Sequence, residues 1–200
     1  MSQLGLALAR VASDLDDLGA SWALVGGLAV GARAEPRTTR DIDVAVLVED
    51  DVEAGQLTFA LRQRGYAVLA TVEQKRLRRL ATVRLRPPLA RAQGPVVDLL
   101  FCSSSLEAET IRAAERLEAL PSVVVPVARI PHLVAMKVLA RDDRRRPQDL
   151  DDIHALLDEA APEEIALSRS LLATVEARGA NRGRALVEAF DQLLAARDRS

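Results

Sequence analysis

Two aspartates open an otherwise apolar strand pattern in the segment DIDVAVLV, which begins at Asp41. Side chains two positions apart on a β-strand share a face, so Asp41 and Asp43 point together while Ile42 and the following valines point the opposite way. Two carboxylates roughly 6.6 Å apart repel each other by about 2–3 kcal/mol at an effective dielectric constant near 20. The spacing therefore predicts a positive partner, and a divalent metal ion is the first candidate.

A third aspartate, Asp98, interrupts the apolar run PVVDLLF. A buried ionised carboxylate without a partner is too costly to keep, so Asp98 must be paired, protonated or bound to a cation. Aspartates on neighbouring strands form a hard-oxygen site suited to Mg²⁺ or Mn²⁺. Zinc is not indicated, because His132, His154 and Cys102 lack the spacing of a ligand cluster.

A glycine pair is the candidate phosphate site. Gly26 and Gly27 follow the apolar segment SWALV and precede a short helical pattern. Glycines between a strand and a helix let backbone N–H groups approach a triphosphate closely, and the positive end of the helix dipole favours the anion. A plain tight turn is the alternative interpretation of the same pair.

These motifs together resemble the polymerase-β-type nucleotidyltransferase superfamily. The segment ALVGGLAVGARAEPRTTRDIDVAV holds the glycine pair, a short helix and Asp-x-Asp, and Asp98 supplies the third aspartate on a later strand. The segment HLVAMKVLARDDRRRPQDLDDIHALL resembles the second half of the AbiEii-type toxin nucleotidyltransferases, in which a helical lysine precedes an Asp-x-x-Asp helix. The two matches together span roughly residues 22–158.

The resemblance implies a role for each matching residue. The implied metal ligands and catalytic residues are Asp41, Asp43 and Asp98, with Asp98 as general base for an acceptor hydroxyl. The implied nucleotide-binding residues are Gly26, Gly27, Arg37, Thr39 and Lys137, and the further candidates are Arg40, Asp149 and Asp152.

Several of these residues also have structural explanations. Arg37 and Arg40 can neutralise a triphosphate or pair with the neighbouring aspartates, and Thr39 can serve only to shape the loop. Asp149 and Asp152 lie three positions apart on one side of a helix, but acidic residues in a first helical turn also complement the helix dipole.

Lys137 is unusual in this chain. Of the 27 Lys and Arg residues, the lysines are Lys75 and Lys137 alone. Lys137 follows Leu133 and Val134 by four and three positions, which predicts a partly desolvated place on the apolar side of its helix. Such a lysine needs an anion, and nucleotide phosphates are the functional candidate. A snorkelling side chain or an internal salt bridge is the alternative.

The elements that must position these residues follow from hydrophobic periodicity and turn signals. Helices are expected over residues 4–20, 28–34, 50–66 and 103–120, and strands in SWALVGG, from about Asp41, and over 67–72, 82–87, 95–101 and 122–127. The rest is predicted to be helical over 131–142, 147–158, 162–178 and 182–197.

This order predicts an α/β (α+β) protein in which helices flank a mixed β-sheet and a helical part follows. The resemblance implies the nucleotidyltransferase fold. We expect a catalytic domain over residues 1–130 and a helical region over 131–200 packed on it.

Composition limits the function classes. A chain of 200 residues with 49% hydrophobic content can bury a sizeable core. The net charge of −2 gives no global basic field, so nucleic-acid binding would depend on local clusters such as KRLRRL and RDDRRR. No apolar run approaches the roughly 18–20 residues of a membrane span. A single cysteine and the lack of a secretory pattern predict a cytoplasmic location.

These features predict a metal-dependent nucleotidyltransferase that moves a nucleoside monophosphate from an NTP to an acceptor hydroxyl, with Mg²⁺ or Mn²⁺ as cofactor. The resemblance implies the toxin of an AbiEii-like toxin–antitoxin pair, with tRNA or another RNA as acceptor, a cognate antitoxin as partner and no membrane association. The alternatives are a small-molecule nucleotidyltransferase of the antibiotic-modifying kind and a non-catalytic nucleotide-binding module on the same fold.

Overall fold

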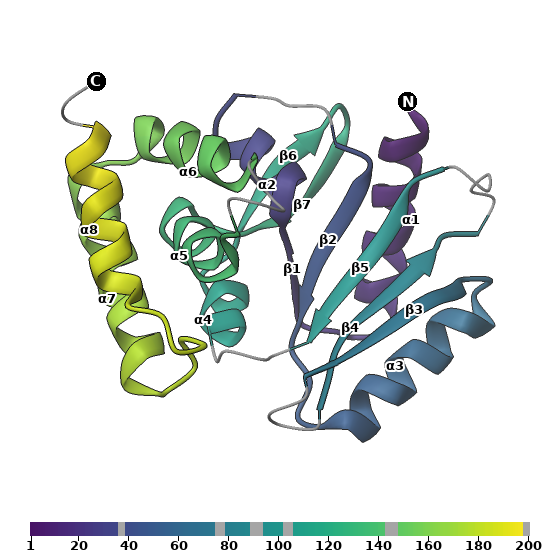
Figure 1. Ribbon diagram of the computed structural model, residues 1–200. Helices are drawn as coiled ribbons and strands as arrows, with labels where there is room; N and C mark the ends of the chain where they lie inside the picture. Colours follow the sequence, from purple (N-terminus) through teal and green to yellow (C-terminus); the bar gives the residue numbers. More distant parts are fainter. Residues whose placement is uncertain (36–38, 75–78, 89–93, 102–105, 143–147, 198–200) are drawn as a thin grey trace.

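The computed structural model describes residues 1–35, 39–74, 79–88, 94–101, 106–142 and 148–197. Its strands form one seven-stranded sheet in the order β3-β4-β5-β2-β1-β7-β6 (Figure 1). The strands are β1 (Trp22–Val25), β2 (Asp41–Val46), β3 (Ala67–Gln74), β4 (Arg79–Arg86), β5 (Val96–Phe101), β6 (Glu115–Leu120) and β7 (Val123–Val127). The helices are α1 (Gln3–Asp17), α2 (Gly26–Arg33), α3 (Asp51–Gln63), α4 (Leu106–Arg112), α5 (Ile130–Ala140), α6 (Gln148–Glu159), α7 (Pro162–Ala177) and α8 (Leu186–Arg197).

The sheet is mixed, as the sequence predicts. β2 runs parallel to β5 and antiparallel to β1, while β4 runs antiparallel to both β3 and β5. β1 also pairs in parallel with β7. Because β2 and β5 run in the same direction, side chains near the start of each strand lie at the same end of the sheet, where both strands begin. This places the aspartate-bearing ends of both strands together.

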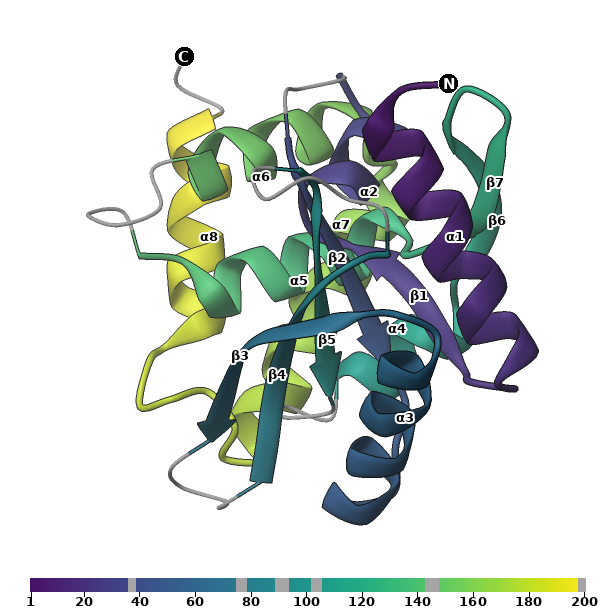
Figure 2. The same ribbon diagram turned by 90° about the vertical axis from the view of Figure 1, so that its right-hand side faces the viewer.

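Helices cover both faces of the sheet. α1 and α3 lie on one face, and α4 and α5 lie on the opposite face (Figures 1 and 2). α2 follows directly from β1 and packs against β2 and β6. Among the described residues, no helix combines the length and the apolar character that crossing a membrane requires.

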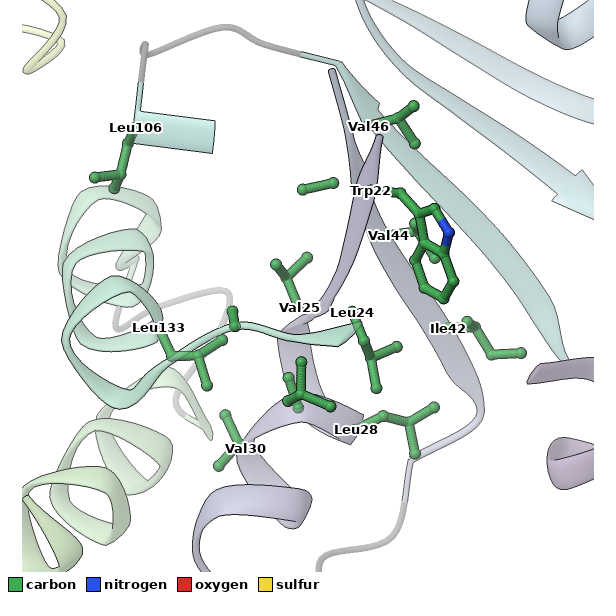
Figure 3. Close-up of a cluster of buried hydrophobic side chains, with 14 of the residues drawn as sticks. Trp22, Leu24, Val25, Leu28, Val30, Ile42, Val44, Val46, Leu106 and Leu133 are labelled. Atoms are coloured by element: carbon green, nitrogen blue, oxygen red, sulfur yellow. The ribbon is translucent and has the colours of Figure 1, made fainter. Parts of the chain in front are cut away.

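The core follows the strand alternation predicted for DIDVAV. Ile42, Val44 and Val46 are fully buried (Figure 3). They share a face with Trp22, which pairs with Val46 in the ladder and donates its indole N–H to Asp16 of α1 at 2.8 Å. The alternation therefore buries the apolar side chains under α1 and leaves Asp41 and Asp43 on the other face of the sheet.

The prediction of a helix over residues 103–120 is wrong for the second half of that segment. The described helix α4 ends at Arg112, and Glu115–Leu120 forms strand β6, an antiparallel partner of β7. Glu, Arg, Leu and Ala in this segment all favour a helix, so local propensity misleads here. Pairing with the apolar strand VVVPV outweighs that propensity, and Ser122 with φ of 65° closes the turn between the strands.

The C-terminal helices join the sheet through one continuous core. Helix α5 packs against α6 and α7, and its Leu133, Val134 and Val138 are at most 1% exposed. The hydrophobic cluster runs without a break from Ala7 in α1 to Leu193 in α8. Helix α5 begins at Ile130, one residue before the helix predicted over 131–142, and the division into a catalytic domain and a helical region stays a prediction.

Candidate active site

A row of polar side chains crosses three neighbouring strands. Asp43 of β2 is paired with Asp98 of β5 in the parallel ladder, and Asp98 is paired with Arg84 of β4 in the antiparallel ladder. Residues paired in this way point to the same face of a sheet. On the other side of Asp43, the partner in the ladder is Val25, the last residue of β1. Backbone register therefore aligns two of the predicted metal ligands beside the glycine pair.

The glycine pair forms the beginning of α2. Gly26 has φ of +65°, a left-handed conformation that favours glycine, and a Cβ built on it would collide with the carboxylate of Asp43. Gly27 is the next residue of the helix and is buried. The backbone at the positive end of α2 thus lies in direct contact with a predicted metal ligand, which is the arrangement expected of a phosphate cradle.

Arg84 holds the third aspartate. Its Nε donates to Asp98 Oδ1 at 2.8 Å and its Nη2 donates to Asp98 Oδ2 at 2.6 Å. The same Nη2 lies 3.7 Å from Asp41 Oδ2. Hydrogen bonding to Asp98 and the charges of Asp41 and Asp43 raise the pKa of the Arg84 guanidinium. A single cation is therefore stabilised by all three predicted metal ligands.

The sequence pattern does not single out Arg84. The segment TVRLRP alternates as a strand should, and its arginines look like ordinary solvent-facing side chains. Arg84 pairs with Asp98 because the two residues lie opposite each other in the β4–β5 ladder. This position depends on the register between two strands joined by a long connection. One signal in the sequence could have suggested the Arg84–Asp98 pair: the strand that carries Arg84 directly precedes the strand of Asp98 in the chain.

The described residues hold no ready-made cluster of three or more His, Cys, Asp or Glu side chains around a metal position. The donor set nevertheless fits Mg²⁺ or Mn²⁺. Asp43 and Asp98 are adjacent on one face, their hard carboxylate oxygens suit these ions, and a cationic group is already drawn to Asp98 and Asp41. Gly26 has no side chain, and the Asp43 carboxylate occupies the position that a Cβ would take.

The polar row opens into a cleft of about 780 Å³ between the sheet and the helical part. Strands β2 to β5, helices α4 and α5 and the segment between α7 and α8 all contribute to its walls. The charged residues among the described lining are Asp43, Glu73, Arg84, Asp98, Glu107, Asp142 and Arg182. The cleft is large enough for a nucleotide or a small acceptor, and carboxylates predominate on its described surface.

Lys137 lies in the interior rather than in the described lining of the cleft. Its Nζ lies 2.7 Å from Asp149 Oδ1 and 2.7 Å from Asp152 Oδ2, and its side chain is only 13% exposed. Both aspartates belong to α6 and are buried. The internal salt bridge, one of the two explanations for a desolvated lysine, is present. The nucleotide contact of Lys137 stays a prediction.

The loop residues are only partly described. Thr39 donates its hydroxyl to the backbone carbonyl of Asp41 at 3.5 Å, which fits a role in shaping the loop, and Arg40 is exposed. Arg37 lies outside the described residues. Their contacts with a nucleotide stay predictions.

Neither histidine belongs to this row. His132 is buried in α5, where burial and the charge of Arg129 lower its pKa. His154 lies in α6, and Cys102 lies outside the described residues. Neither His132 nor His154 appears in the described lining of the cleft.

Solved structures share this architecture. An antigenic nucleotidyltransferase-like protein from Paracoccidioides brasiliensis is 20% identical and has a TM-score of 0.53, with 94% of this chain and 92% of that chain covered. ANT(2")-Ia in complex with adenylyl-2"-tobramycin is 15% identical and has a TM-score of 0.57, with 89% of this chain and 99% of that chain covered. At these identities the likeness shows a common nucleotidyltransferase fold.

Sequence comparison identifies the family. No curated protein matches the chain significantly. A family profile described as "Nucleotidyl transferase AbiEii toxin, Type IV TA system" matches residues 7–199, which covers the sheet, the polar row and the C-terminal helices. The chain therefore belongs to the AbiEii family of nucleotidyltransferase toxins.

Proposed function

We propose that this protein transfers a nucleoside monophosphate from an NTP to a hydroxyl group of an acceptor, with release of pyrophosphate. The observation that carries the proposal is the row in which Asp43 and Asp98 lie side by side next to Gly26 at the start of α2. Asp43 lines the cleft and also contacts Gly26, so the carboxylate pair lies next to a helix N-terminus, and nucleotidyl transfer needs both features.

In this proposal Asp41, Asp43 and Asp98 hold Mg²⁺ or Mn²⁺. When bound, the ion supplies a positive charge that stabilises the charge developing on the reacting phosphates. The backbone N–H groups of Gly26 and Gly27 bind phosphate oxygens at the start of α2. Arg37, Thr39 and Arg40 contact the triphosphate from the loop before β2, and Lys137 contributes a further positive charge near the phosphates.

The chemical step uses Asp98 as general base. The acceptor oxygen forms a bond to the α-phosphorus of the NTP while the bond from that phosphorus to the α,β-bridging oxygen breaks. Pyrophosphate leaves with the bridging oxygen, and the proton of the acceptor hydroxyl passes to the carboxylate of Asp98. For this step Asp98 must first be released from the two hydrogen bonds with Arg84.

The acceptor that we propose is tRNA or another RNA, and a cognate antitoxin controls the reaction. Membership of a type IV toxin–antitoxin family supports the antitoxin. The RNA acceptor is what the resemblance to the AbiEii-type toxins implies. The test is incubation of the protein with each labelled NTP and total tRNA, with and without Mg²⁺. We expect label in the RNA for at least one NTP in the presence of the metal. If no NTP labels RNA although the protein is folded and binds nucleotide, the RNA acceptor is ruled out.

The charge of the cleft favours a second candidate. Its described lining carries the carboxylates of Asp43, Glu73, Asp98, Glu107 and Asp142 against the guanidinium groups of Arg84 and Arg182. Such a surface attracts a cation more readily than a polyanion. A polycationic small molecule bearing a hydroxyl, such as an aminoglycoside, is therefore the alternative acceptor. Transfer of label to an aminoglycoside and not to tRNA would favour it.

A further inference from the structure

Arg84 occupies both oxygens of the carboxylate that the proposed reaction needs. The fork of Nε and Nη2 engages Asp98 at 2.8 and 2.6 Å, and Nη2 also lies 3.7 Å from Asp41. A bidentate, charge-assisted pair of this kind is among the stronger polar contacts that a protein makes. Arg84 therefore neutralises the Asp98 carboxylate with a charge that the chain itself supplies.

The fold itself creates this pairing. Arg84 and Asp98 are direct partners in the β4–β5 ladder, so their side chains emerge on the same face without a special loop or turn. The Asp98 side chain is only 11% exposed, and a carboxylate this well buried requires a counter-charge. The Arg84 side chain is 44% exposed and lines the cleft, so its guanidinium has space to move away from Asp98.

We infer that Arg84 is an internal counter-ion that must release Asp98 before this carboxylate can take a divalent cation, and that Arg84 thereby sets the metal affinity of the site. This inference rests on the proposed function, because it assumes that Asp98 is a metal ligand. Arg84 is a positioning residue in this scheme, since it acts through Asp98 and not on the substrate. Removing its guanidinium removes a competitor for the metal.

A titration of the full-length, nucleotide-free protein with Mn²⁺ tests this. Free Mn²⁺ is followed by electron paramagnetic resonance for wild type, Arg84→Gln and Arg86→Gln. Arg86 carries the same side chain on the same strand, but the β4–β5 ladder pairs Arg84 and not Arg86 with Asp98, so Arg86 is the matched control. We expect Arg84→Gln to bind Mn²⁺ at least about tenfold more tightly than wild type, the ratio that corresponds to a competing charge-assisted hydrogen-bond pair. Arg86→Gln should bind like wild type.

A second readout is thermal melting. Without metal, Arg84→Gln should melt below wild type, because Asp98 loses its counter-charge, and Mn²⁺ should raise its Tm by more than it raises that of wild type. If Arg84→Gln does not fold, Arg84→Lys keeps the charge without the bidentate fork and should still bind Mn²⁺ more tightly than wild type.

The outcomes separate this inference from the proposed function. The inference is overturned if Arg84→Gln, or Arg84→Lys where that variant is used, binds Mn²⁺ no more tightly than wild type. It is also overturned if no protein in the series binds Mn²⁺. If Mn²⁺ binds more tightly to the Arg84 variant but wild type transfers no labelled nucleotide to any acceptor, the role of Arg84 stands and the proposed reaction fails.

Discussion

At the scale of single residues, the site depends on which side chains share a face of the sheet. Asp41 and Asp43 share a face because they are two positions apart on one strand, and this could be predicted from the local sequence. The placement of Asp98 beside Asp43 and of Arg84 beside Asp98 depends on strand register. Register involves contacts between distant parts of the chain, so spacing alone predicts the aspartates as candidates but not the arginine that pairs with them.

Asp43→Asn tests the metal ligand with a nearly isosteric change. Without metal, the variant should melt at about the temperature of wild type or above it, because one charge is removed from a group of like charges. With Mg²⁺ and NTP, transfer should fall by about two orders of magnitude or more, since a hard anionic ligand is lost. The measurements are thermal melting with EDTA or with Mg²⁺ and NTP, and the rate of label transfer.

The control for Asp43→Asn is Asp142→Asn, the same change at another carboxylate of the cleft. It should leave most of the transfer rate intact. A metal-free Asp43→Asn protein that melts well below metal-free wild type would mean that Asp43 is a structural carboxylate, because breaking a buried pair costs stability with or without metal.

Gly26→Ala tests the contact between the start of α2 and Asp43. Gly26 and Gly19 both have left-handed φ values, +65° and +68°, but only at Gly26 would a new Cβ meet the Asp43 side chain. Gly19→Ala should therefore cost only the left-handed penalty of about 1–2 kcal/mol. Gly26→Ala should cost more and should also reduce nucleotidyl transfer, since Asp43 must move. Urea unfolding and transfer assays of both variants give the comparison, and equal effects would contradict the role of Gly26.

At the scale of elements, the sequence predicts most helices and strands because their patterns are locally consistent. The strand that starts at Asp41 has strict alternation, and α3 has an Asp50 cap whose side chain accepts from the N–H groups of Val52 and Glu53 at 2.9 Å. The failure occurs at β6, where ERLEAL favours a helix but pairs with β7. Its β-structure comes from its hairpin partner and not from its own composition.

Lys137→Met tests how α5 and α6 are held together. The change keeps the length of the side chain but leaves Asp149 and Asp152 buried without their cation. Removing one partner of a buried ion pair costs about 3–5 kcal/mol, so the Tm should fall markedly without any nucleotide. Arg112→Met, at an exposed helical position of α4, is the control and should change stability little.

A companion variant separates the structural role of Lys137 from contact with phosphates. Adding Asp149→Asn and Asp152→Asn to Lys137→Met removes the uncompensated charges and should recover part of the lost stability. If the recovered protein also regains nucleotide affinity, measured by isothermal titration, Lys137 acts through α6. If stability returns while nucleotide affinity stays low, Lys137 contacts the nucleotide, as the family resemblance implies.

At the scale of the whole molecule, the sheet and the C-terminal helices share one core and enclose the cleft between them. The cleft therefore exists only when both parts are folded. The sequence predicts that a helical part follows the sheet, but how its helices pack on the sheet depends on contacts between distant residues. Leu133 and Val138 look like the apolar face of any helix until the elements that pack around α5, chiefly α6 and α7, are known.

A shared core predicts that the chain unfolds as one cooperative unit, with a calorimetric enthalpy equal to the van't Hoff enthalpy. Two destabilising changes at opposite ends of the fold sharpen this test. Asp14→Asn weakens the contacts of α1 with Arg64 and Tyr66, which approach the Asp14 carboxylate at 2.9 Å each, and Lys137→Met acts between α5 and α6. Both changes should move the same single transition to lower temperature, whereas Asp17→Asn, at a side chain that is 63% exposed, should not. Only a shared core couples changes at such distant sites. Two separate transitions, each shifted by only one of the destabilising variants, would therefore contradict the shared core. They would mean that the sheet and the helical region are independent domains.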